Sequence, residues 1–145
     1  MSFDGCITSA NSFLAELATF LQSQGLGTYT TSASRTIFLM AMPSSPEVCT
    51  SIRLTGGTGD ERGPTIQGYS VQILHRNTSI GSGIGQAQLI HDSMANKFFG
   101  SSGSPKLIIT AGRCEPQHKP GPFYLDENAR PVYTLNSEWK ISGHD

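Results

Sequence analysis

Residues 121–141 have the sequence GPFYLDENARPVYTLNSEWKI, in which a polar turn leads into a long strand. The prolines and glycine at 120–122 break regular structure, and the polar residues at 126–128 favour a turn. Pro131 can begin the strand, because a missing N–H is tolerated there. After it, one face carries Tyr133, Leu135, Ser137, Trp139 and Ile141. This period of two predicts a half-buried strand with one face in the core and the other wet or covered by a partner.

Two amphipathic helices are expected to cover the sheet to which this strand belongs. Apolar residues recur at helical spacing over residues 8–23, and Gly25 offers the left-handed residue that ends many helices. A second stripe consists of Ile84, Ala87, Ile90, Met94 and Phe98, and Gly100 closes it. Residues 77–85 are expected to form a loop before that helix, with Ser82 as a possible cap.

Four further strands are predicted upstream of residues 131–141. Residues 36–42 are mainly apolar at both odd and even positions, which is typical of a central strand with both faces covered. A tight connection with Pro46 at its corner predicts a hairpin with residues 49–55. Residues 65–76 and 106–111 complete the set, with a bulge expected at Gly68.

Taken together, these elements predict one α+β domain spanning residues 1–145. Its sheet is expected to be antiparallel or mixed, with about five strands and two covering helices.

Two glycine- and proline-rich segments, 56–64 and 112–122, are expected to be loops. Each is either a simple connection or a projecting arm that docks on a partner. Eight residues in them are candidate interface residues: Gly56, Gly57, Asp60, Glu61, Arg62, Arg113, His118 and Lys119. Arg62 is the contact residue that we expect to matter most in the first arm.

Composition restricts the classes of function. The net charge is −1 and basic residues form no run, which disfavours autonomous binding of nucleic acid. Only 14% of residues are charged. A low charged fraction is typical of the centre of a protein interface, and a polar but uncharged surface explains it equally well. Three widely spaced cysteines give no disulfide framework, and no apolar run is long enough to span a membrane. A soluble protein made in a cytoplasm is expected.

The chain offers no complete catalytic or metal-binding motif. Residues 81–85, GSGIG, follow a strand and open a helix, but they lack the further glycine or lysine of known phosphate loops. His91 and Asp92 are adjacent on a helix, so their side chains are expected to diverge and to form no relay. His75 is expected to be a partly buried neutral histidine with a local partner. We therefore expect no cofactor, no metal and no catalytic residue.

Four segments, in order along the chain, resemble a known family. They are LAELATFLQSQGLGTY, MPSSPEVCTSIRLTGG, PTIQGYSVQI and PFYLDENARPVYTLNSEWKI, which together run from residue 14 to residue 141. They resemble the bacteriophage minor capsid protein family, whose members are similar to the tail terminator, or tail completion, proteins of long-tailed phages. No single segment is a catalytic signature, and the specificity comes from the ordered set.

The resemblance implies a structural virion protein of the tail or neck, assembled in the host cytoplasm. Its expected partners are further copies of itself in a homohexameric ring, the tail tube protein and the head–tail connector protein. Genomic DNA would pass through the lumen without sequence-specific binding, and no membrane is involved. The ring would cap the tube and stop its polymerisation. The alternatives are a head-completion or neck adaptor protein and a small nucleotide-binding enzyme that uses residues 81–85.

Overall fold

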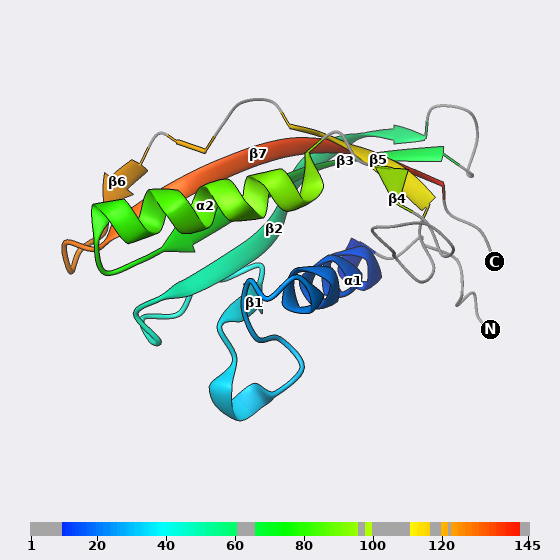
Figure 1. Ribbon diagram of the computed structural model, residues 1–145. Helices are drawn as coiled ribbons and strands as arrows, with labels where there is room; N and C mark the ends of the chain where they lie inside the picture. The colour runs from blue at the N-terminus through cyan, green and yellow to red at the C-terminus, as the bar shows by residue number, and fades with distance from the viewer. Residues whose placement is uncertain are drawn as a thin grey trace.

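Figure 1 shows the computed structural model, which describes residues 10–60, 66–95, 98–99, 111–116, 120–121 and 123–142. Its elements, in chain order, are α1 (Ala10–Ser23), the 3₁₀ helix η1 (Ser32–Ser34), β1 (Ile37–Leu39), β2 (Cys49–Asp60), β3 (Ile66–Arg76), α2 (Ile80–Met94), β4 (Phe98–Phe99), β5 (Ala111–Pro116), β6 (Phe123–Leu125) and β7 (Pro131–Ser142). The strands of the described residues form one sheet in the order β1-β2-β3-β7-β5-β4, with β6 also paired to β7. Since β1 and β2 are parallel and the other pairs antiparallel, the sheet is mixed and the α+β prediction is confirmed.

Strand β7 lies inside the sheet, between β3 and β5. It pairs with β3 from Val132↔Arg76 to Ser142↔Ile66, and with β5 and β6 along its other edge. The predicted alternation is confirmed, because Tyr133, Leu135, Ser137 and Trp139 are buried. Ser137 belongs in this core because its Oγ accepts a hydrogen bond of 3.1 Å from Trp139 Nε1.

Both helices pack on the same face of the sheet (Figure 1). On α1, the Phe13 ring stacks on Tyr69 at 5.5 Å and meets Trp139 edge to face at 5.3 Å. The predicted end of α1 is confirmed: Gly25 has φ +77°, and Leu26 N–H donates to Leu21 C=O at 3.1 Å. This is the Schellman arrangement, which satisfies carbonyls that the last helical turn leaves open.

Helix α2 begins and ends earlier than its apolar stripe predicted. It starts at Ile80 because Ser79, and not Ser82, is the N-cap, with Ser79 Oγ accepting from Ser82 N–H at 3.2 Å. It ends at Met94, and Phe98 belongs to β4. Ile84, which we had placed in the buried stripe, is 42% exposed, and Gly100 lies outside the described residues.

The prediction of a central strand and a hairpin at residues 36–55 is wrong. β1 has three residues, lies at the edge of the sheet and runs parallel to β2. Met40 ends it with a left-handed φ of +70°. The 40–48 connection is therefore a crossover and not a hairpin turn, because parallel neighbours cannot be joined by a tight turn.

The two predicted loops are partly strand, which corrects both predictions. β2 continues through the glycine-rich segment to Asp60, which pairs with Gln67. Two register shifts along β2, between Leu54 and Gly56 and between Gly56 and Gly59, absorb its extra residues, so the bulges lie on β2 and not at Gly68. Residues 112–116 of the second loop belong to β5, and the predicted strand at 106–111 lies outside the described residues except for Ala111.

Candidate assembly surfaces

The interface candidates that the structure describes lie at or near one end of the sheet. Asp60, Gln67, Ile141 and Gly112 form a row across β2, β3, β7 and β5, and Arg113 follows in the next row. Gly56 and Gly57 lie in β2 a few residues before that end. The other candidates, Glu61, Arg62, His118 and Lys119, lie outside the described residues. The strand pairing thus brings parts of two segments that are about fifty residues apart in sequence to a common end of the sheet.

Polar side chains cover the sheet face opposite the helices. Arg53 Nε donates to Gln72 Oε1 at 2.8 Å, and Gln72 Nε2 donates to Asn136 Oδ1 at 3.2 Å. In the next row, Ser70 Oγ donates to Glu138. These bonds link β2, β3 and β7 side chain to side chain, which fits the wet face expected from the alternation in residues 131–141.

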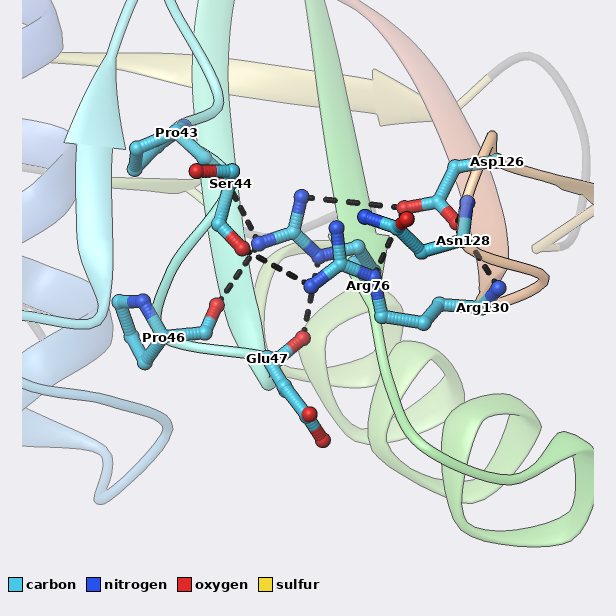
Figure 2. Close-up of polar contacts among 8 residues, drawn as sticks. All are labelled: Pro43, Ser44, Pro46, Glu47, Arg76, Asp126, Asn128 and Arg130. Carbon is cyan, nitrogen blue, oxygen red and sulfur yellow. Dashed lines mark hydrogen bonds and ion pairs between the residues drawn. The ribbon is translucent and has the colours of Figure 1, made fainter.

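A buried arginine holds the 40–48 connection against the other end of the sheet (Figure 2). Arg76, at the end of β3, is only 4% exposed. Its Nη2 donates to the carbonyls of Pro43 and Pro46 at 2.7 Å each, and its Nε donates to Glu47 C=O at 3.1 Å. The guanidinium therefore replaces the backbone partners that this irregular segment lacks.

A second arginine ties the β6–β7 turn to the same segment (Figure 2). Arg130 Nε pairs with Asp126 Oδ2 at 2.9 Å, and its Nη1 donates to Ser44 C=O at 2.8 Å. Asp126 Oδ1 accepts from the N–H groups of Asn128 and Arg130 at 2.9 and 2.8 Å. Desolvation would raise the pKa of Asp126, but these donors and the Arg130 charge outweigh it and hold that pKa below its ordinary value. These contacts stabilise the turn and hold it against the 40–48 connection.

His75 lies beside a pocket of about 320 Å³ between the end of α1 and the start of α2. The ring is 2% exposed, with Nδ1 3.0 Å from Thr50 Oγ1 and Nε2 3.1 Å from Asn77 Nδ2. Because Asn77 Oδ1 accepts from Thr78 N–H, Asn77 Nδ2 is the donor to Nε2, so Nδ1 carries the proton. Burial lowers the pKa of His75 to about 4. The expected neutral histidine with local partners is confirmed.

Cys49 lines the same pocket and is 1% exposed. Burial raises the pKa of its thiol, against the opposing charges of Arg76 and Arg130. A protonated, buried thiol is a poor nucleophile, and both ring nitrogens of His75 are already engaged. The pocket therefore has no activated nucleophile in Cys49.

The family model for bacteriophage tail terminator proteins matches residues 20–142. The chain belongs to that family. It is thus a component of the phage tail in the virion, from a family of structural proteins, as the four resembling segments led us to expect. A search of curated proteins gives no match for the chain.

This tail terminator family member shows no metal site in the part of the chain that the structure describes, where no group of three or more potential ligands gathers. None of the described helices is long and apolar enough to cross a membrane.

The glycines of the GSGIG segment lie in a helix, and one of them, Gly83, allows that helix to pack closely on the sheet. They lie inside α2, whereas a phosphate loop places its glycines before the helix. Gly83 packs against the ring of Tyr133, whose hydroxyl donates to Ile80 C=O at 2.8 Å. Gly81 and Gly85 face open space. The sequence pattern could not distinguish these roles, because the ring that meets Gly83 comes from β7.

Gly83→Ala is expected to lower the free energy of unfolding by about 1–3 kcal/mol, as overpacking in a core does. An added Cβ would overlap the Tyr133 ring at Cε1 and lie 3.3 Å from Asn77 Cβ. Gly85→Ala is the matched control, since its Cβ would meet nothing within 4 Å and alanine favours a helix by up to about 1 kcal/mol. Urea unfolding measures both, and equal midpoints for the two variants would contradict the packing role of Gly83.

The expectation that the side chains of His91 and Asp92 diverge too far for a hydrogen-bonded relay is wrong, because the two are in contact. His91 Nδ1 lies 3.0 Å from Asp92 Oδ1. Asp92 is at the surface, because its side chain is 60% exposed, against 14% for His91, and it also accepts from Gln88 Nε2 at 2.8 Å. Rotation about the side-chain bonds closes the angle by which neighbouring helical positions diverge.

Proposed function

We propose that this tail terminator forms a homohexameric ring that caps the tail tube, stops its polymerisation and joins the tail to the head connector. The family match over residues 20–142 is the observation that carries the proposal. The chain acts as one domain, residues 1–145, without catalysis or cofactor, and its interfaces are assembly surfaces. A ring arises when one surface of a subunit meets a different surface of the next and the rotation closes.

The end of the sheet that holds Asp60 and Arg113 is proposed to face the tube or the connector. The candidate residues Gly56, Gly57, Glu61, Arg62, His118 and Lys119 belong to segments 56–64 and 112–122, of which the described parts reach this end. With a net charge of −1, the subunit does not bind DNA tightly, and the genome passes through the lumen without sequence-specific contacts.

The direct experiment mixes purified protein with its tail tube protein and measures mass, ring symmetry and tube length by native mass spectrometry and negative-stain imaging. We expect six-fold rings at the tube ends and tubes of limited length. A protein that leaves tube growth unchanged would contradict the terminator function. Binding to portal in place of tube would support a head-completion or neck adaptor protein.

Thermal stabilisation by nucleotides tests the enzyme alternative. Gly85→Ala is the suitable variant, because Gly83→Ala also disturbs the Tyr133 contact. We expect neither the wild type nor the variant to be stabilised, since residues 81–85 are helical. Stabilisation of the wild type that Gly85→Ala removes would support a phosphate site.

A further inference from the structure

Strand β1 leaves part of its backbone open at one edge of the sheet. Thr36 C=O accepts from Thr50 N–H, and Met40 N–H donates to Ile52 C=O, both at 2.8 Å. Even-numbered positions therefore face β2, and Leu39 points its N–H and C=O away from it. Among the residues that the structure describes, the Leu39 N–H has no backbone partner.

A mainly apolar pocket of about 380 Å³ lies beside this open edge. Its lining is formed by Tyr29, Arg35, Phe38, Leu39, Ala41, Met42 and Pro43. Arg35 is the one charged residue in that lining, with its Nε donating to Tyr29 C=O at 2.8 Å and its Cζ 4.9 Å from the centre of the Tyr29 ring. Within the described part of the chain, Arg35 has no carboxylate partner. The site thus combines strand edge, apolar pocket and cation, which together fit an extended acidic and apolar segment.

Strand β6 offers such a segment at a different place on the molecule (Figure 1). It pairs only with β7 among the described strands. Because Asp126 N–H donates to Arg130 C=O at 2.9 Å, positions 124 and 126 face β7, and Leu125 points its backbone groups away. Tyr124 and Leu125 are 52% and 56% exposed.

The turn after β6 carries the charge that complements Arg35. Glu127 is exposed, and no ion pair involves it in the described residues. The hydrogen bonds of Asp126 Oδ1 to Asn128 and Arg130 hold this turn in place, so Glu127 is presented on a rigid support. A rigid segment loses little conformational entropy on binding.

We propose that the β6 edge of one subunit pairs with the β1 edge of the next copy of this chain, with Leu125 in the pocket beside β1 and Glu127 against Arg35. The two edges are different surfaces, so the contact is head to tail and can close into a ring. Burial of the exposed apolar side chains stabilises the contact, and the backbone groups that Leu39 and Leu125 point away from their own sheet pair with each other. This inference rests on the proposed ring and identifies its subunit interface.

Two substitutions of equally exposed leucines test the apolar part of the contact. Leu125→Lys is expected to raise the subunit dissociation constant at least about tenfold, as loss of an interface anchor does. Leu89→Lys, on the outer side of α2, is the control and is expected to leave the ring unchanged, since Leu89 is 55% exposed and Leu125 is 56% exposed. Native mass spectrometry measures the ring. If the wild type is monomeric in the absence of tubes, the fraction of tube ends that carry a ring, measured by imaging, replaces native mass spectrometry.

A charge exchange tests the Arg35–Glu127 contact. Arg35→Glu is expected to weaken the ring. The double variant Arg35→Glu with Glu127→Arg is expected to restore it, because the two charges are exchanged. The control double variant Arg35→Glu with Glu47→Arg is not expected to restore the ring. Rings of wild-type stability in both Leu125→Lys and Arg35→Glu would overturn the proposed interface while leaving the terminator function intact. A wild type that neither forms rings nor caps tubes would instead overturn the proposed function.

Discussion

Arg76→Ala is expected to lower the free energy of unfolding by about 3–5 kcal/mol, the range for a buried charge network that loses one partner. The side chain is 4% exposed and donates to three carbonyls of the 43–47 segment. Alanine would leave these carbonyls without their donor, and Asp126 would lose the charge that lies 4.0 Å from it. Urea unfolding followed by the fluorescence of Trp139, the one tryptophan of the chain, measures the loss.

Two further variants separate the geometry of Arg76 from its charge. Arg76→Lys keeps the charge but not the planar fork that reaches several carbonyls, so an intermediate loss is expected. Arg53→Ala is the control on the same sheet face, because among the described residues Arg53 bonds to Gln72 alone, and it is only partly buried. Its expected cost is about 1 kcal/mol. A loss for Arg76→Ala no larger than that of Arg53→Ala would contradict the role of Arg76 in holding the crossover.

Stability is expected to fall by about 3 kcal/mol as the pH falls from 6.5 to 4, because of His75. The pKa of His75 is about 4 in the folded protein, against 6.5 ordinarily. Below pH 6.5 the unfolded chain binds a proton that the folded chain excludes. The contribution of neutral His75 is thus fully present above the ordinary pKa, declines as the pH falls, and is lost below the folded pKa.

The matched variant for this pH dependence is His75→Gln, which can retain hydrogen bonds to Thr50 and Asn77 but does not titrate. Stability measured by urea unfolding at several pH values between 4 and 7 should have a smaller slope in the variant, by up to about 1.4 kcal/mol per pH unit. Parallel curves for the wild type and His75→Gln would show that another group causes the pH dependence. Asp126 acts at lower pH, because its pKa is depressed below 3.8.

Local patterns predicted the elements that have a clear period. The two-residue period from Tyr133 to Trp139 identified the buried face of β7, and the stripe from Phe13 to Leu21 identified α1. Gly25 was recognised as the end of α1 because a left-handed residue is a local requirement. The resemblance to tail terminators also needed only the sequence, and the family match confirmed it.

The errors arose where the partner of a segment decides its structure. The apolar run around Met40 predicted a central strand. However, apolar residues at both odd and even positions do not reveal where a strand lies in a sheet. The glycines of β2 predicted a loop, and pairing with β3 made a bulged strand of them. Residues 77–85 predicted a loop, but Gly83 lies in α2, where it packs against the Tyr133 ring of β7.

The sequence by itself determined the α+β class, the inward face of β7, the first helix with its cap, and membership of the tail terminator family. Only the tertiary structure decided that β1 is a parallel edge strand, that Arg76 holds the crossover, and that Thr50 is a partner of the His75 ring. The physical reason is the separation along the sequence of the residues that are in contact. Periodicity and caps depend on neighbours within a few residues. In contrast, Thr50–His75 and the contacts of Arg76 join residues 25 or more positions apart, and β1 pairs with a strand that follows a long connection. These residues become neighbours only when the sheet forms.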